Sequence, residues 1–384
     1  MEIILISSMN IFPPNFGGAM RVFQIAKNLG ELGCFVHLFI PYCEKQIELA
    51  NVHINPVRWL NRIKYPIDLP GIIILSRSLI NLIRERIGCY ERIDAIQAEG
   101  LSCAPQSIAL KYLLRKPTVL DEHNCETMLW YRIDKINNMR WKRLQLLEKA
   151  CCRSFDHMFA VSNFDKNVIQ SLFSLDPMKV TVVPNGVDIN HFTSSVEGET
   201  EIRSKYRLGN KPIVLFTGRL SYFPNEDALR LIMLKIYPNI RKLMPTSVLM
   251  IVGTRPPQWL MRLKSESLIV TDAVDDVVPY IEASDVCIAP LRFGSGTRLK
   301  ILEYMACEKP VISTKIGAEG LDVVNGKHLI IEEDIELFAP WIECLVRKKE
   351  YAKEIGKNAR KLIVEKYTWK NIIQELISTY KQLI

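Results

Sequence analysis

The sequence predicts an α/β fold with two domains, each built on a parallel sheet. Its 384 residues exceed what one ordinary hydrophobic core accommodates. Short apolar segments alternate with segments of helical spacing, the pattern of repeated strand–helix–strand units. A Val-Pro-Asn-Gly-Val-Asp run lies at residues 183–188, and its Asn185-Gly186 pair predicts a tight turn that needs positive φ. The small polar residues that follow, from Thr193 to Thr200, fit a linker. We therefore expect domains at residues 1–188 and 189–366, followed by a helix at 367–384.

In the first half, Glu2–Ser7, Ala19–Leu32 and Cys34–Ile40 form one strand–helix–strand unit, which implies a parallel sheet with a right-handed crossover. Gly17 and Gly18 lie where the loop meets this helix, so backbone amides and the helix dipole can face an anion there. A flexible turn is an equally good interpretation. The further elements expected in this half are strands at Asp94–Gln97, Pro117–Leu120, Asp156–Val161 and Lys179–Val183, and a helix at Thr127–Phe155.

The second half repeats the alternation. Its expected strands are Lys211–Gly218, Ser247–Gly253, Leu268–Thr271, Asp285–Pro290, Pro310–Ser313 and Leu329–Ile331. Its expected helices run from Pro224 to about Arg241, from near Thr297, from Asp334 to Lys348 and from Tyr351 to Tyr367. Asp275 and Asp276 are expected to be acids at a helix start, where the dipole favours them.

Composition narrows the class of partner. The net charge of +8 and the pI near 8.9 suit nucleotide phosphates or an acidic membrane surface, and no nucleic-acid-binding motif is present. The ten cysteines contain no C-x-x-C pair, which favours reduced core residues in the cytosol over disulfides or metal ligands. The N-terminus enters an apolar strand without a basic lead, so no signal peptide is expected, and no apolar run is long enough to span a bilayer.

The loop Gly294-Ser295-Gly296-Thr297 lets the backbone approach a ligand, and the helix that follows offers unpaired amides. Arg298 and Lys300 contradict the usual preference for acids at a helix start, which a bound phosphate would explain. Glu303, one turn later, has a carboxylate suited to two ribose hydroxyls. A Gly-Ser turn with solvated cations is as good an interpretation of this stretch alone.

His123 follows an apolar strand and is flanked by acids, in the run Asp121-Glu122-His123-Asn124-Cys125-Glu126. The carboxyl ends of strands in α/β folds are where ligands bind and chemistry occurs. A lone histidine is usually structural, but this placement favours a functional role.

Residues 55–92 combine basic and apolar side chains, including Arg58, Trp59, Arg62 and Tyr65. Such a segment can lie on a membrane interface and bind a lipid-linked acceptor. A solvated basic helix packed on the sheet is the simpler interpretation, and the pattern favours it.

Several motifs together resemble the retaining GT-B glycosyltransferases, the family 4-like group 1 family. They are Glu303, Tyr304-Met305-Ala306, Lys309-Pro310-Val311 and the run at 183–188. The loop Gly294–Lys300 and the later Gly-Ala-Glu-Gly at 317–320 resemble a subgroup whose loop reads Gly-x-Gly-Thr-Arg-Leu-Lys. Three positions depart from the family: Ser295 stands where a first glutamate is usual, Pro224 where a lysine is usual, and Glu308 where a glycine is usual.

The resemblance implies two Rossmann-like domains that face each other across a cleft, with the C-terminal helix crossing back to the first. It also implies roles for individual residues. His123 would contact the transferred sugar, Arg219 and Lys300 would stabilise the leaving diphosphate, and Glu319 would lie near the sugar or diphosphate. The donor-binding residues implied are Gly17, Gly18, Gly218, Ala273, Val274, Gly294, Ser295, Gly296, Thr297, Arg298 and Glu303. No metal and no cofactor is expected, since no D-x-D motif is found at the donor site.

The resulting expectation is a hexosyltransferase that moves a sugar from a nucleotide sugar to an acceptor hydroxyl, with retention. UDP-sugar is the first expectation for the donor and GDP-sugar the second, and the acceptor is a saccharide, a lipid-linked saccharide or another glycoconjugate. The expected setting is polysaccharide, lipopolysaccharide or glycoconjugate synthesis in the cytoplasm, with peripheral contact to the inner membrane face. The alternatives are a nucleotide-sugar 2-epimerase, a sugar phosphorylase, or a non-catalytic nucleotide-sugar-binding scaffold.

Overall fold

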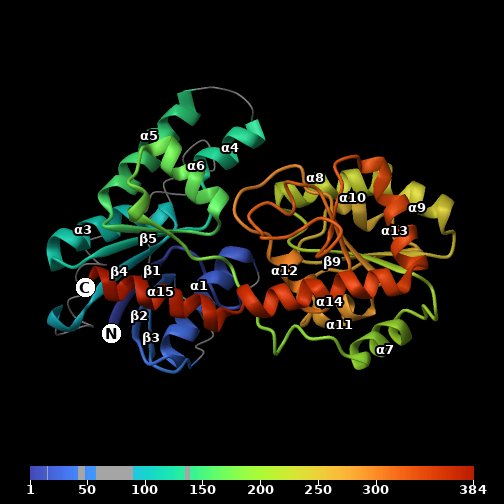
Figure 1. Ribbon diagram of the computed structural model, residues 1–384, viewed down its shortest axis with the longest axis horizontal. Coiled ribbons are helices and arrows are strands. Elements are labelled where there is room, and N and C mark those ends of the chain that lie inside the picture. The colour runs from blue at the N-terminus through green and yellow to red at the C-terminus, as the bar shows by residue number, and fades with distance from the viewer. Residues whose placement is uncertain (15, 42–47, 58–89, 135–138) are drawn as a thin grey trace. The chain divides into compact units, whose positions relative to one another are not determined.

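The computed structural model describes residues 1–14, 16–41, 48–57, 90–134 and 139–384 (Figure 1). They form two compact units: Met1–Asn185 with Trp369–Ile384, and Gly186–Thr368. One unit contains a seven-stranded sheet and the other a six-stranded sheet. Every strand pair in both sheets is parallel, which confirms the predicted fold class.

The first unit has the strand order β3-β2-β1-β4-β5-β6-β7. Alternate residues of β1 enter opposite cores, because side chains in a strand alternate between faces. Ile3 and Leu5 pack with α1 and α15, whereas Ile4 and Ile6 pack with α3, α5 and α6. The strands are β1 (Glu2–Ser7), β2 (Phe35–Pro41), β3 (Val52–Val57), β4 (Ala95–Glu99), β5 (Thr118–Glu122), β6 (His157–Ala160) and β7 (Val180–Val182); the helices are α1 (Gly17–Glu31), α3 (Ala104–Leu114), α4 (Glu126–Asp134), α5 (Met139–Ser154), α6 (Asn163–Phe173) and α15 (Trp369–Leu383).

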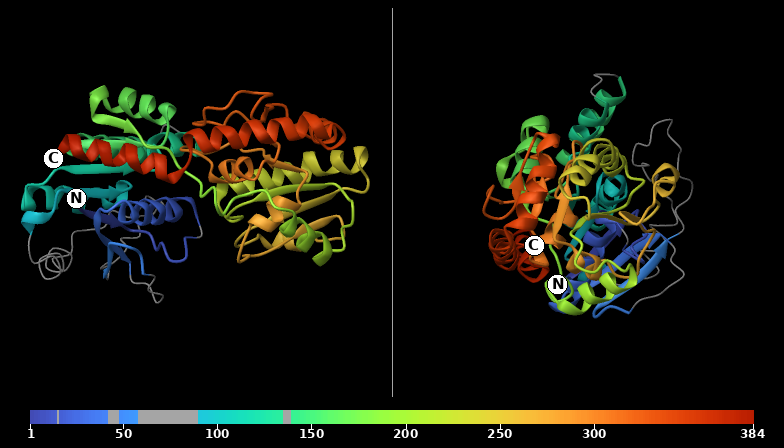
Figure 2. Two further views of the ribbon diagram at one scale, coloured as in Figure 1. Left: turned by 60° about the horizontal axis from the view of Figure 1, so that its bottom comes forward. Right: turned by 90° about the vertical axis from the view of Figure 1, so that its right-hand side faces the viewer.

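The second unit has the strand order β10-β9-β8-β11-β12-β13. Figure 2 shows helices on both faces of each sheet. Residues of α7, α11 and α12 form one core of this unit, residues of α8, α9, α10 and α13 form the other, and α14 contributes to both. The strands are β8 (Ile213–Thr217), β9 (Val248–Val252), β10 (Leu268–Val270), β11 (Val286–Ala289), β12 (Val311–Ser313) and β13 (Ile330–Ile331); the helices are α7 (Val196–Lys205), α8 (Phe223–Leu231), α9 (Tyr237–Leu243), α10 (Gln258–Met261), α11 (Val278–Ala283), α12 (Leu299–Ala306), α13 (Phe338–Arg347) and α14 (Lys349–Lys366).

In each sheet the chain order reverses beside the first strand, between β1 and β4 and between β8 and β11. Connections leave such a pair of strands toward opposite faces, so the carboxyl ends of the two strands border an opening between the loops. The strand order therefore indicates where each unit can bind a ligand.

The helix expected at Thr127–Phe155 corresponds to α4 and α5, and residues 135–138 between them lie outside the described residues. Two other sequence-based expectations about elements were wrong. The segment expected to be a linker is helical from Val196 onward, and Gly198 lets α7 approach α11 so closely that an added Cβ would lie 2.8 Å from Pro279 Cα. The Asn185-Gly186 pair was expected to need positive φ, yet neither is among the positive-φ residues of the described chain.

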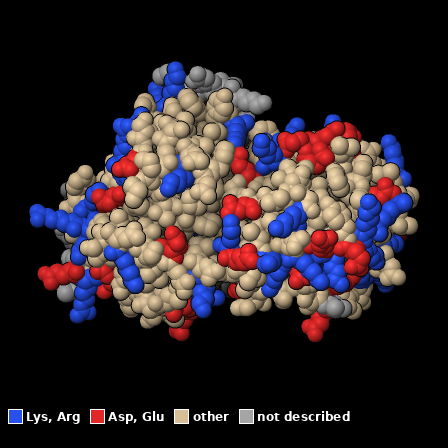
Figure 3. Space-filling model, viewed as in Figure 1, with Lys and Arg blue, Asp and Glu red and all other residues tan. Residues whose placement is uncertain are grey.

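The basic and apolar segment singled out at residues 55–92 falls largely on residues 58–89, which lie outside the described residues. None of the helices in the described ranges combines the length and the apolar composition that a membrane span requires. Every cysteine that the structure describes is free of a disulfide, and most are buried. On the face drawn in Figure 3, Lys and Arg alternate with Asp and Glu rather than forming one basic surface.

Arg21, on α1, joins three parts of the first unit although its side chain is only 1% exposed. It donates to both oxygens of Asp121 at the end of β5, at 2.8 and 2.7 Å. It also donates to the carbonyls of Val183 and Pro184 and to Asn185 Oδ1, at 2.8, 3.0 and 3.1 Å. The Asn185 side chain thus serves to hold Arg21, where the sequence had suggested only a turn.

Replacing Arg21 with Met should destabilise the protein strongly, because it leaves the Asp121 carboxylate buried without its partner. Removing one member of a buried ion pair typically costs about 3–5 kcal/mol. The double variant Arg21→Met/Asp121→Asn should be more stable than Arg21→Met, since it removes the stranded charge. Urea unfolding of the unmodified protein and of both variants measures their free energies of unfolding. A double variant that is less stable than Arg21→Met would contradict this role of Arg21.

Gly356→Ala should also destabilise, although alanine usually favours a helix over glycine. An added Cβ in α14 would lie 1.9 Å from Glu308 O and 2.7 Å from Glu308 C, so backbone would have to move. Overpacking of this kind costs about 1–3 kcal/mol. Thermal unfolding measures this loss of stability, and Lys357→Ala, at an exposed neighbouring position, is the control. Equal melting temperatures for both variants would refute the close approach of α14 to the backbone of Glu308.

Candidate active site

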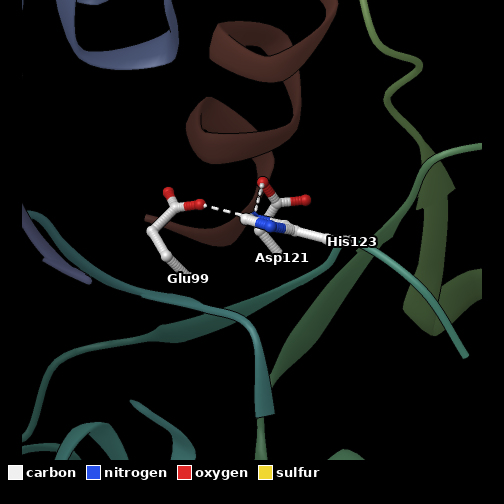
Figure 4. A group of neighbouring side chains, drawn as sticks. All are labelled: Glu99, Asp121 and His123. Atoms are coloured by element: carbon white, nitrogen blue, oxygen red, sulfur yellow. Dashed lines mark hydrogen bonds and ion pairs between the residues drawn. The ribbon is translucent and has the colours of Figure 1, made fainter. Parts of the chain in front are cut away.

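His123 follows β5, and its ring points toward the ends of two neighbouring strands (Figure 4). Its Nε2 lies 2.9 Å from Glu99 Oε2, at the end of β4, and 3.6 Å from Asp121 Oδ2. The side chains of Glu99 and Asp121 are fully buried, and that of His123 is 12% exposed. The structure thus places the predicted histidine at the carboxyl edge of the sheet, one strand away from the β1/β4 reversal.

Further polar groups lie behind Glu99. Gln97 Nε2 donates to Glu99 Oε1 at 2.6 Å, and the Tyr380 hydroxyl of α15 donates to Gln97 Oε1. Burial raises the pKa of Glu99, and the neighbouring carboxylate of Asp121 raises it further, whereas the hydrogen bond from His123 opposes the change. The C-terminal helix is therefore hydrogen-bonded to the strand that supports the histidine.

Gly18 lies against the other side of the histidine ring. The helix α1 begins at Gly17, and a Cβ added to Gly18 would lie 3.3 Å from His123 Nδ1 and 2.8 Å from Met9 Sδ. A larger residue at position 18 would therefore displace the ring or Met9. The structure brings together two residues that the sequence had marked separately, Gly18 and His123.

Glu99, Asp121 and His123 also offer one possible metal ligand each, and these atoms lie within 4.8 Å of one another. Both oxygens of Asp121, however, already accept hydrogen bonds from the Arg21 guanidinium. A second cation beside that guanidinium would be repelled. We therefore interpret the group as a hydrogen-bonded network around His123.

In the second unit, Lys300 of α12 reaches the end of β8. Its Nζ donates to Asn225 Oδ1 at 2.8 Å and lies 3.9 Å from the centre of the Phe216 ring. A Cβ on Gly218, whose φ is +141°, would lie 3.0 Å from Lys300 Nζ and 3.0 Å from Asn225 Nδ2. Asn225 also donates to Arg219 O at 2.8 Å. The lysine is thereby held beside the backbone that leaves β8.

The ionisable groups of α12 are strongly perturbed. The pKa of Lys300 is lowered to about 7, mainly by burial and in part by the charge of Arg298, although Glu303 acts in the opposite direction. Burial raises the pKa of Glu303 to about 7. Among the described residues, the Glu303 carboxylate accepts no hydrogen bond. Groups that titrate near neutrality in an α/β opening are candidates for ligand binding or catalysis.

The glycine loop before α12 is organised by Arg298. The helix begins at Leu299, so Arg298 is its N-cap residue rather than part of its first turn, as the sequence had suggested. Its Nη1 donates to the carbonyls of Ser295 and Gly296, at 2.5 and 2.8 Å. A Cβ on Gly294 would lie 2.3 Å from Nη2 of the same guanidinium. Arg298 therefore shapes the loop.

The remaining predicted residues lie on loops of the second unit. Arg219 is exposed, and its guanidinium has no hydrogen-bond partner among the described residues. Ala273 is exposed and Val274 half-buried after β10, and the Ala273 amide donates to Asp272 Oδ1 at 2.7 Å. Glu319 is half-buried in the loop after β12. Thr297 is half-buried and directly precedes the N-cap residue of α12.

Sequence reasoning missed Arg21, Glu99 and Asn225. Glu99 ends the apolar strand Ala-Ile-Gln-Ala-Glu, and a carboxylate at that position was a usable signal. Arg21 is a charged residue on the buried side of an amphipathic helix, and the sequence pattern contained this signal too. Asn225 had no signal, because polar residues are common in the first turn of a helix.

Two family models match the chain, one for each unit. "Glycosyltransferase Family 4" matches residues 17–191, and "Glycosyl transferases group 1" matches residues 211–348. A 44.6 kDa protein of the cps region of Klebsiella pneumoniae is 23% identical over 396 residues, 98% of each chain. The UDP-Gal:alpha-D-GlcNAc-diphosphoundecaprenol alpha-1,3-galactosyltransferase of Escherichia coli is 26% identical over 257 residues, 64% of each chain.

The fold has a close counterpart among solved structures. The Anabaena protein HepE, solved in complex with UDP, superposes with a TM-score of 0.75 at 16% identity, covering 100% of both chains. That likeness confirms the predicted fold of two parallel α/β sheets, the GT-B type. The two family models, which leave only short stretches of the chain unmatched, show that the chain belongs to the family 4, group 1 glycosyltransferases.

Proposed function

We propose that this glycosyltransferase is a hexosyltransferase that takes its sugar from a nucleoside-diphosphate sugar and holds the donor at the β8/β11 opening of the second unit. The observation that carries the proposal is Lys300 Nζ, fixed by Asn225 beside Gly218. At the end of a strand, a cation beside backbone that a ligand can approach closely is suited to bind a diphosphate. We further propose that the chain belongs to the subgroup with the Gly-x-Gly-Thr-Arg-Leu-Lys loop.

Each group at this opening has a proposed role. Arg219 and Lys300 stabilise the negative charge that develops on the leaving diphosphate, as the usual lysine is replaced by Pro224. Glu303 accepts from the ribose hydroxyls, and the loop 294–297 offers backbone amides to the phosphates. Ala273 and Val274 contact the base, while Glu319 lies near the sugar or diphosphate.

The first unit is proposed to supply the acceptor side. His123 contacts the transferred sugar, and Gly17 and Gly18 approach the donor phosphates and the acceptor at the start of α1. The transfer retains the anomeric configuration, as the family resemblance implied. These roles require no metal, because the cations and helix amides of the site can balance the leaving charge.

UDP-sugar is the donor that we propose first, with GDP-sugar as the alternative. The support is the UDP bound in the HepE structure and the UDP-galactose for which the E. coli relative is named. The acceptor proposed is a saccharide or lipid-linked saccharide of polysaccharide or glycoconjugate synthesis. The cps region of one relative and the undecaprenol-linked acceptor of the other support this choice, and with it a peripheral position at the inner membrane face.

A thermal-shift panel of UDP, GDP, ADP and dTDP, each with and without EDTA, tests the donor class. One diphosphate should raise the melting temperature without metal, by about 2.7 kcal/mol of stabilisation at a hundredfold excess over its dissociation constant. Glu303→Ala should lose most of this stabilisation, whereas Glu308→Ala, a matched change past the end of α12, should keep it. Equal responses of both variants would contradict the ribose role of Glu303.

The affinity for the diphosphate should fall as the pH rises above 8. In the free protein Lys300 loses its proton above about pH 7, whereas a bound diphosphate favours the charged amine, so binding must take up a proton. Glu303, with its pKa of about 7, is already ionised in that range and adds no slope. We expect a loss approaching tenfold per pH unit.

Isothermal titration of the stabilising diphosphate at several pH values measures this slope. Lys300→Arg is the matched control, because its guanidinium keeps its charge and should bind with little pH dependence. A flat profile in the unmodified protein, or an equally steep one in Lys300→Arg, would remove Lys300 from the phosphate site.

A further inference from the structure

We propose that Glu99 is a positioning residue: it holds the His123 ring with Nε2–H toward the buried carboxylates and Nδ1 toward Gly18, so that the substrate meets Nδ1. The inference rests on the proposed function, because that function makes His123 a substrate contact. Glu99 would act only through His123, because its side chain is fully buried and contacts the histidine ring at Nε2.

The placement of the ring carries the argument. Nε2 faces two carboxylates, Glu99 Oε2 at 2.9 Å and Asp121 Oδ2 at 3.6 Å. An ionised carboxylate only accepts, so the nitrogen that faces both must donate. Turning the ring by half a turn would put a carbon at this place and break the bond to Glu99. A histidine whose one nitrogen is bound to a buried carboxylate has its tautomer and orientation fixed by that bond.

The two carboxylates are themselves held from the other side. Glu99 Oε1 accepts from Gln97 Nε2 at 2.6 Å, and Gln97 is fixed by Tyr380. Asp121 is bound at both oxygens by Arg21. Because β4, β5, α1 and α15 all contribute, neither carboxylate can follow a displaced ring. Hydrogen bonds of this kind, from neighbouring side chains, fix the geometry of a functional side chain.

Gly18 shows which ring nitrogen faces the start of α1, where the donor and the acceptor are proposed to bind. A Cβ there would lie 3.3 Å from Nδ1, so the absence of a side chain keeps backbone next to that nitrogen. The start of α1 also directs its first amides to the same edge. A substrate that reaches the ring from this edge contacts Nδ1 and not Nε2.

Nitrogen-15 NMR of the full chain, labelled only at its six histidines, tests the inference without turnover. His123→Gln assigns the signals of position 123. In the unmodified protein we expect a one-bond N–H signal at Nε2 that exchanges slowly with water. Glu99→Ala should lose that signal, whereas Glu99→Gln should keep it, because the carboxamide oxygen can accept the same hydrogen bond.

Kinetics supply the second readout. Glu99→Ala should lower kcat about tenfold or more, by analogy with the loss seen when a carboxylate that orients a metal-bound histidine is removed. The KM for the donor should stay within about twofold, since the second unit is proposed to bind the nucleotide. Glu99→Gln should recover most of kcat. A general loss of packing would not separate the alanine from the glutamine variant in this way.

Glu122→Gln is the control, since Glu122 is a buried acid at the end of β5, and none of the hydrogen bonds described for this part of the chain joins it to His123. It should leave the Nε2 signal and kcat unchanged. A proton on Nδ1 with none on Nε2 in the unmodified protein, the mark of a protonated Glu99 donating to the ring, would overturn the inference even if Glu99→Ala does not fold. Absence of donor binding and transfer would instead overturn the proposed function and leave the NMR result readable.

Discussion

The reversal of strand order in each sheet is the constraint from which both candidate sites follow. Connections that diverge to opposite faces cannot cover the carboxyl ends of β1 and β4, or of β8 and β11. In the first unit this edge receives Glu99, Asp121 and His123. In the second it receives Gly218, the glycine loop and the start of α12. The same topological rule, applied twice, thus positions polar groups on a framework that is otherwise apolar.

Both edges contain buried ionisable groups, which are costly for stability. Replacing a buried ion pair with apolar residues of similar volume is often neutral or stabilising. Arg21 and Asp121 nevertheless occupy the interior behind His123, and Lys300 and Glu303 have pKa values shifted to about 7 from opposite directions. Such groups are understandable if they hold a functional side chain in place or bind a charged ligand. We propose the first of these roles for the groups in the first unit and the second for those in the second unit.

The sequence predicted the fold well because its signals are local. Apolar strands and amphipathic helices are visible in a short window, and the resemblance around Glu303 covers one continuous stretch. The strand β3 was missed, since Val-His-Ile-Asn-Pro-Val contains a proline and only two buried positions.

The side-chain network could not be predicted, because its members are distant in sequence. Arg21 and Asp121 are 100 residues apart, and Tyr380 and Gln97 are 283 apart. Asn225 and Lys300 meet across 75 residues. His123 itself was found because its position at a strand end is a local feature. What supports it depends on which strands are neighbours, and a single sequence does not state that order.

Hydrogen–deuterium exchange of the full chain, with and without saturating diphosphate, tests the central claim most directly. If the donor binds at the β8/β11 opening, peptides containing residues 216–225 and 294–303 should gain protection, because backbone amides there would bond to the ligand. The amino-terminal ends of β8 and β11 should exchange at the same rate with and without the diphosphate. Protection confined to the first unit, at a concentration that stabilises the protein, would contradict the claim.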